Sequence, residues 1–142
     1  MGRIMNRIKL TNNTDLDKSR EGSLSRERVR SIEIDALIDT GAVMLALPED
    51  VVVALGVPQE GKRRVRDARG KLVEVGWASS IHFEILGRGM TCDAFVLPAG
   101  ATPLIGQLQL EALDLIVDPR AQEVRVNPAS PDMPILDLKV CA

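Results

Sequence analysis

The stretch from Ser31 to Ala42 constrains the fold of this chain more than any other part of its sequence. Apolar and polar side chains alternate through most of residues 31–38, which is the period-two pattern of a β-strand. The pattern runs directly into Asp39-Thr40-Gly41-Ala42, where the glycine permits a turn. A carboxylate at the end of an apolar strand is held in position by the scaffold. These residues therefore predict a strand that presents Asp39 as a fixed acid.

A second segment strengthens this interpretation. Leu104-Ile105-Gly106 follows the tetrad by some sixty-five residues and leads into a helix-like stretch, residues 107–113. The two motifs together resemble those of retroviral-type (retropepsin-like) aspartic proteases, in which an apolar-apolar-glycine segment passes beside the catalytic loop and then opens a short helix. The order of expected elements from Arg28 to Val126 is similar to theirs as well. The chain thus resembles a bacterial-style, single-domain member of that superfamily.

The number and spacing of short strands predict an all-β, barrel-like domain. The resemblance adds the topology: a closed, barrel-like retropepsin (acid protease) fold with one or two short helices and one Asp-Thr-Gly per chain. We expect an N-terminal strand and polar connection over residues 1–27 and the protease-like domain over residues 28–127. A Pro-rich extension, residues 128–142, would supply a terminal strand that joins a dimer interface.

The resemblance implies an aspartic endopeptidase, in which two carboxylates share one proton. One carboxylate activates a water molecule and the other protonates the carbonyl oxygen of the peptide bond. Only Asp39 is followed by a hydroxyl residue and glycine, because the four other candidates lack that pattern: Asp35, Asp67, Asp114 and Asp118. The second carboxylate is therefore expected from Asp39 of another copy, across a two-fold axis.

The resemblance also assigns roles to neighbouring residues. Catalysis would rest on Asp39, with Thr40 bracing the two loops across the dimer and Gly41 letting the backbone approach the substrate. Ala42 would leave room beside the cleaved bond. Further residues would bind substrate, as flap tip, loop support or pocket lining: Val43, Ala68, Arg69, Gly70, Leu104, Ile105 and Gly106, with Trp77 as an additional pocket candidate.

Two departures from the viral pattern stand out. Val43 and Met44 follow the tetrad where the viral enzymes have acidic residues, and Gln107 follows Gly106 where they have arginine. The ion-pair network near the viral dimer interface cannot form here in the same way. The Gly-rich viral flap is replaced by residues 67–70, Asp-Ala-Arg-Gly.

Local signals predict the remaining elements. Pro48 opens a short helix that Gly56 ends, since proline suits a first helical position and glycine a helix end. Residues 11–26 form a polar connection of uncertain order. Short strands are expected at residues 8–10, 43–47, 63–66, 72–77, 81–86, 90–97, 115–117, 123–126 and 135–140.

Composition narrows the class of protein. Hydrophobic residues make up 45% of the 142 residues and aromatic residues only 2%, so a folded core has to be built from Val, Leu and Ile. The net charge of −2 provides no electrostatic case for nucleic acid. No apolar run is long enough to span a bilayer, and Met1 to Leu10 lacks the apolar stretch of a signal peptide. Cys92 and Cys141 form neither a disulfide framework nor a metal-spacing motif. We expect an intracellular (cytoplasmic) protein without cofactor or metal, whose partners are a second copy and a peptide substrate.

Alternative interpretations stay open. Asp39 could simply cap a turn, because Asp-Thr-Gly suits an Asx-turn, in a small β-barrel interaction protein. The same fold could also serve as a peptide-binding or regulatory module with weak or absent catalysis. His82 is interpreted as a solvent-facing strand residue, and the basic run Lys62–Arg66 as a solvated strand edge.

Overall fold

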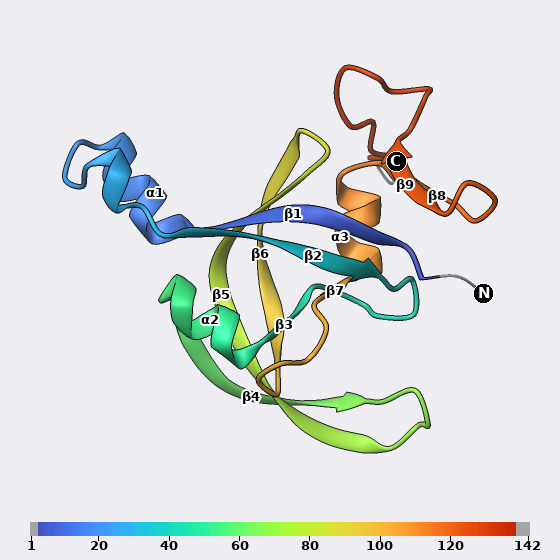
Figure 1. The fold of residues 1–142 in the computed structure, drawn as a ribbon, viewed down its shortest axis with the longest axis horizontal. Helices are drawn as coiled ribbons and strands as arrows, with labels where there is room; N and C mark the ends of the chain where they lie inside the picture. The colour runs from blue at the N-terminus through green and yellow to red at the C-terminus, as the bar shows by residue number, and fades with distance from the viewer. Residues whose placement is uncertain (1–2, 139–142) are drawn as a thin grey trace.

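The computed structural model describes residues 3–138, in which β-strand is the most abundant secondary structure. Strands make up 45% of the structure and six of them close into a barrel, so the predicted β class and barrel shape are confirmed in this coarse form. Figure 1 shows the barrel strands crossing at the centre of the molecule. In order around the barrel they are β1 (Met5–Asn12), β2 (Ser31–Ile38), β7 (Leu104–Ile105), β3 (Ala46–Pro48), β6 (Arg88–Leu97) and β5 (Leu72–Ile85).

Closure depends on β1, which pairs antiparallel with β2 along most of its length and with β5 at its C-terminal end. Leu10 illustrates the junction, because it lies opposite Ile32 of β2 and also opposite Phe83 of β5. The ring is completed by parallel pairing of β2 with β7 and of β3 with β6, and by antiparallel pairing of β7 with β3 and of β6 with β5. The barrel strands therefore leave no open sheet edge within the ring.

The barrel interior is aliphatic, as the low aromatic content predicts. Its largest fully buried side chains include one aromatic residue, Phe83, packed among leucine, isoleucine and valine. The predicted helix is confirmed as α2 (Glu49–Leu55), which follows Pro48 and ends at Gly56 in the left-handed conformation (φ 66°). Its buried residues join the core, so α2 covers part of the barrel.

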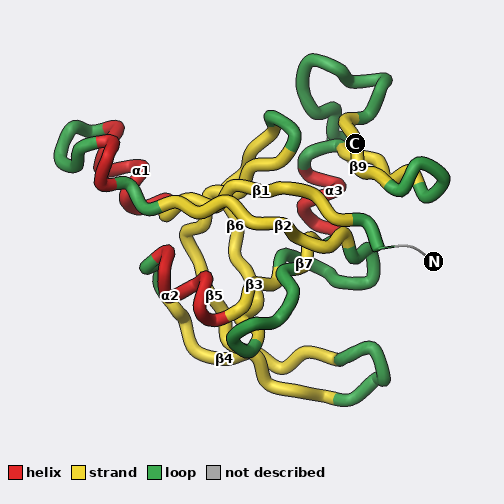
Figure 2. Tube along the Cα trace, in the orientation of Figure 1, coloured by secondary structure: helices red, strands yellow, loops and turns green. Residues whose placement is uncertain are grey.

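The N-terminal connection is more ordered than the sequence indicates. Residues 13–20 form helix α1 (Asn13–Arg20), and the 3₁₀ turn η1 (Arg26–Arg28) follows. Asn12 caps α1 by accepting a hydrogen bond from the Asp15 amide, and its side-chain amide donates to the Leu55 carbonyl at the end of α2. Figure 2 shows this helix projecting from the strand-rich centre. With α3 (Gln107–Ala112), the described residues contain three short α-helices, where one or two were predicted.

A long hairpin extends beyond the barrel. Residues 72–77 and 81–86, predicted as separate strands, are largely one 14-residue strand, β5, which continues through an irregularity between Ala78 and Ile81. In addition to β6, β5 pairs with β4 (Gln59–Arg66), which is an edge strand outside the closed ring. Figure 1 shows the β4–β5 hairpin, in green, reaching away from the barrel. The turn at Asp67–Lys71 is its tip.

The C-terminal region forms a second, two-stranded sheet of β8 (Leu115–Asp118) and β9 (Glu123–Val126). Residues 127–138 follow without a strand, so the predicted strand over residues 135–140 is wrong for residues 135–138; residues 139 and 140 lie outside the described range. The buried Arg88 side chain donates to the carbonyls of Leu113, Asp114 and Ser130 and so ties this segment to the body. No helix in the described part of the chain is long and apolar enough to cross a membrane.

Candidate active site

Asp39 lies where strand β2 leaves the barrel. Its backbone amide donates to the carbonyl of Ile105 at 3.0 Å, and the Leu37 amide donates to Pro103 at 2.9 Å. Both hydrogen bonds continue the parallel pairing of β2 with β7. The predicted strand and the position of Asp39 at its end are confirmed, and the backbone on either side of the acid is held by β7.

The segment after β7 crosses residues 39–45, the loop between β2 and β3, which we call the Asp39 loop. The amide of Gln107 donates to the Ala42 carbonyl at 2.8 Å, and the amide of Leu108 donates to the Val43 carbonyl at 3.0 Å. Gly106 is buried at the crossing against the Met44 backbone. The two sequence motifs thus meet in space, and residues 104–108 support the loop that carries Asp39.

The carboxylate of Asp39 is half-buried and oriented by its own loop. The Gly41 amide donates to Oδ1 at 3.0 Å, and the Ala42 amide donates to the Asp39 backbone carbonyl at 3.1 Å. A Cβ atom on Gly41 would lie 3.2 Å from that Oδ1. This is the Asx-turn geometry. Within residues 3–138 no donor reaches Oδ2, so one carboxylate oxygen is available for a ligand or a second acid.

A cavity of about 920 Å³ opens in front of Asp39. The Asp39 loop forms one side, the β4–β5 hairpin another, and Phe95 and Leu97 of β6 extend the wall. The sequence-predicted residues that line it are Asp39, Gly41, Ala42, Val43, Ala68, Leu104 and Trp77. We refer to this cavity as the Asp39 cleft.

Other predicted site residues lie outside the cleft lining. Arg69 and Gly70 are at the exposed hairpin tip, while Ile105 and Gly106 are buried behind the loop. Thr40 is exposed and faces a second hollow. The predicted site residues therefore fall into two groups: those that line the Asp39 cleft and those that lie behind it or beside it.

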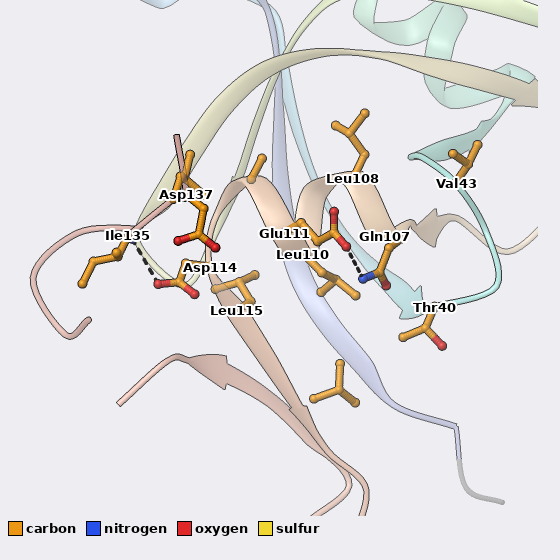
Figure 3. A pocket seen from close by; sticks show the side chains of 13 residues that line it. Thr40, Val43, Gln107, Leu108, Leu110, Glu111, Asp114, Leu115, Ile135 and Asp137 are labelled. Atoms are coloured by element: carbon orange, nitrogen blue, oxygen red, sulfur yellow. Dashed lines mark hydrogen bonds between the residues drawn. The ribbon is translucent and has the colours of Figure 1, made fainter. Parts of the chain in front are cut away.

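The second hollow, about 910 Å³, lies beside α3 and the C-terminal segment. Figure 3 shows Thr40 and Val43 on one side and Ile135 and Asp137 on another. The Gln107 side chain donates to Glu111 at 2.9 Å within it. Several exposed apolar side chains gather around this hollow, with exposed fractions of 62% for Val43, 44% for Leu108, 63% for Ile135 and 60% for Leu136. We call this surface the Thr40 face.

The sequence interpretation missed most of the hairpin's contribution to the cleft. The missed lining residues are Arg63, Arg64, Val65, Arg66, Asp67, Val73, Val75, Ala46, Phe95 and Leu97. A signal was present, because Val73, Val75 and Trp77 alternate along the β5 segment after the Asp67–Gly70 turn, and Val65 stands just before that turn. Pairing them about that turn aligns Val65 with Val73.

In the described range, no group of three or more His, Cys, Asp or Glu side chains is arranged to hold a metal ion. The arrangement suits chemistry carried by a carboxylate in a partly apolar cleft. No protein-family model matches this chain, and no curated protein matches its sequence.

Proposed function

We propose that this chain is a retropepsin-like aspartic endopeptidase that is active as a homodimer. The observation that carries the proposal is the position of Asp39. Its carboxylate ends a barrel strand, is braced by the crossing of residues 104–108, and faces a cleft bounded by a long hairpin. An extended peptide lying between loop and hairpin would place its backbone near the carboxylate.

Hydrolysis by this route requires a second carboxylate. The unprotonated acid takes a proton from water as the water oxygen bonds to the carbonyl carbon, while the protonated acid donates to the carbonyl oxygen. Collapse of the resulting diol breaks the C–N bond, and the departing nitrogen takes up a proton. One carboxylate in a single site cannot perform both tasks in the same step.

Asp67 is the other acid that lines the cleft, but its carboxylate already serves the hairpin turn. Its Oδ1 accepts from the amides of Arg69 and Lys71, each at 2.9 Å, and its Oδ2 lies 3.5 Å from the Arg69 guanidinium. We therefore assign the second carboxylate to Asp39 of a second copy.

The Thr40 face supports the homodimer. It lies next to the Asp39 loop, shares Val43 with the cleft, and exposes several large apolar side chains. Burying such side chains in a second copy removes apolar surface from water, which favours association. A dimer formed through this face would bring two Asp39 loops toward a common axis, with Thr40 between them.

A second candidate function is peptide binding without cleavage. The hydrogen bond from the Gly41 amide to the Asp39 carboxylate favours this binding function, because an Asx-turn accounts for Asp39 whether or not the acid reacts. The cleft would then hold an extended peptide in the same place.

The deciding experiment measures cleavage of a diverse peptide library by the wild type and by Asp39→Asn, from pH 3.5 to 7, with and without pepstatin. Asp35→Asn is a matched control, because Asp35 is exposed on the same strand and lies 3.5 Å from Arg7. The endopeptidase proposal expects cleavage by the wild type and the control and none by Asp39→Asn. Cleavage by Asp39→Asn would overturn the mechanism. Absent cleavage by a folded wild-type dimer would favour the binding module.

Mixing tests whether the site is shared. A fixed amount of wild type is equilibrated with increasing Asp39→Asn protein, so that mixed dimers replace wild-type dimers. A shared site predicts that total activity falls as the variant is added, since each mixed dimer holds one aspartate. Activity that stays constant while mixed dimers are shown to form would mean that each chain acts alone.

A further inference from the structure

Arg63 is the cationic side chain on the inner face of the β4–β5 hairpin. In this antiparallel pair, Arg63 lies opposite Val75, and Val65 lies opposite Val73. Directly opposed residues share a face of the sheet, and all four line the Asp39 cleft. Arg64 lies opposite Glu74, out of phase with these four residues along the hairpin, but it also lines the cleft.

The Trp77 ring provides a platform for Arg63. The guanidinium carbon of Arg63 lies 4.9 Å from the ring centroid. The ring is held by an edge-to-face contact with Phe95, at 5.5 Å between centroids, and its Nε1 donates to Asp93 at 3.0 Å. A cation over a tryptophan ring is attracted to the negative face of the π-system. The platform therefore fixes where the Arg63 charge lies.

Backbone carbonyls orient the guanidinium further. One terminal nitrogen of Arg63, Nη1, donates to the carbonyls of Glu60 and Lys62, at 3.3 and 3.1 Å. Within residues 3–138, no carboxylate lies within 4.0 Å of the Arg63 side chain. The Nε and Nη2 donors are therefore free in the described structure, with the planar fork that suits a carboxylate.

Asp67, the acidic residue of the hairpin that lines the cleft, does not neutralise Arg63. The Asp67 carboxylate is directed into its own turn by two amides and by Arg69. Arg64 and Arg66 also border the cleft, so its hairpin side carries an excess of positive charge next to apolar Val65, Val73 and Val75.

We propose that Arg63, stacked on Trp77, forms a subsite of the Asp39 cleft that selects an Asp or Glu side chain in a peptide with otherwise apolar neighbours. The subsite rests on the proposed function, because it assigns the substrate class of the same cleft. The acidic side chain would pair with the free edge of the guanidinium, while apolar neighbours contact the valines and Phe95. The peptide runs between the hairpin and the loop that carries Asp39.

The test measures peptide binding without cleavage. The Asp39→Asn protein is titrated with a capped library of extended apolar peptides made in two versions, with one Glu or one Gln at each position in turn. Trp77 is the single tryptophan and the chain has no tyrosine, so intrinsic fluorescence reports events at the platform. Anisotropy of fluorescein-labelled peptides provides an independent readout.

We expect the Glu version to bind about tenfold more tightly than the Gln version, because hydrogen bonds to charged groups contribute more than neutral ones. Arg63→Gln should remove this difference, and Arg63→Lys should restore part of it. Lys62→Gln is the matched control: it removes one positive charge from the same strand at a residue that does not line the Asp39 cleft, and it should keep the preference. Equal binding of the two versions, no binding of either, or an equal loss in both Gln variants would overturn the subsite.

Cleavage by wild-type protein separates this inference from the proposed function. Asp39-dependent cleavage with no preference for Glu overturns the subsite and leaves the endopeptidase standing. Arg63-dependent binding of the Glu peptides without cleavage supports the subsite and removes the endopeptidase.

Discussion

Gly106 lies so close to Met44 that a Cβ atom built on Gly106 would be 2.4 Å from the Met44 backbone nitrogen and 2.5 Å from its Cα. Real Cβ atoms do not approach backbone atoms this closely, so any side chain at position 106 forces the two segments apart. The same two segments carry the hydrogen bonds from Gln107 and Leu108 to the Asp39 loop. The absence of a side chain at Gly106 is therefore required for the backbone geometry of the loop that carries Asp39.

Gly106→Ala should lower the free energy of unfolding by about 2 kcal/mol or more, because inserting atoms into a packed site typically costs 1–3 kcal/mol. The urea midpoint, at constant m-value, measures the change. Gly61→Ala is the control: Gly61 has φ +81° but nothing within 4 Å of a built Cβ, so the left-handed backbone alone should cost about 1 kcal/mol. Equal losses in the two variants would contradict a steric origin.

Leu108→Glu should weaken homodimerisation about tenfold or more, since a charge would enter the centre of a buried apolar interface. Sedimentation velocity over a dilution series measures the dimer population, and circular dichroism checks that the monomer is folded. Val53→Glu is the matched control, because Val53 is 62% exposed on α2 and does not line the Thr40 face. Unchanged association of Leu108→Glu would remove the Thr40 face as the interface.

Asp15→Asn should reduce stability at neutral pH and alter its dependence on acid. The hydrogen bonds from the Arg30 side chain hold the pKa of the buried Asp15 carboxyl below its ordinary 3.8, outweighing the effect of burial. A lowered native pKa means that the stabilisation is complete above the unfolded pKa and is lost as pH falls through the native pKa. The difference in unfolding free energy between wild type and variant should therefore be constant from pH 7 to 5 and shrink below pH 4. A difference that grows on acidification would contradict this pairing.

Arg88→Met should destabilise the protein by about 2–4 kcal/mol. The variant keeps much of the volume of the side chain but removes the donor to the carbonyls of Leu113 and Ser130, whereas the Asp114 carbonyl keeps the Asn127 amide. Unsatisfied buried groups cost about 1–3 kcal/mol each before relaxation. Hydrogen exchange should quicken at the Ser130 amide, which donates to Asn127 in the same segment. Arg125→Met, which removes only exposed ion pairs with Asp118 and Glu123, should change little.

The Cys92 thiol should be unreactive in the folded protein. Burial is the main cause that raises its pKa to about 12. At pH 8 about one molecule in ten thousand would then carry the reactive thiolate. In a Cys141→Ser background, Ellman's reagent should label Cys92 only after urea unfolding. Rapid labelling of the folded protein would contradict this burial.

The Asp39 region could be predicted from sequence because local pattern and tertiary structure agree there. The alternation of residues 31–38 faces one side of β2 into the barrel, and Gly56 ends α2 by its backbone preference. Pro48 lies just before the first helical residue, in extended conformation, where a first helical position was predicted. The encounter of Gly106 with the Asp39 loop joins residues far apart in the chain. It was predicted through the resemblance and not from any local signal.

Other elements could not be predicted because their cause is tertiary. Helix α1 is short and polar, so no apolar stripe marks it; it is held by the Asn12 cap and by the contact of Asp15 with Arg30. Strand β5 is irregular between Ala78 and Ile81, where Ser80 adopts φ 59°. It continues as one strand because β6 pairs with the residues before and after this irregularity. The stacking of Arg63 on Trp77 requires the hairpin register, which no single segment contains.

Strand β1 has hydrogen-bonded neighbours on both sides, β2 and β5, and Ile8 and Leu10 on it are fully buried. The exposed turn after α1, at Gly22 and Ser23, is where a protease would most readily cut this part of the chain. Such a cut would divide the polypeptide without releasing its first piece, because β1 would stay paired with β2 and β5 in the barrel and would retain α1. The protein can therefore be expected to tolerate expression as two fragments that reassemble around β1.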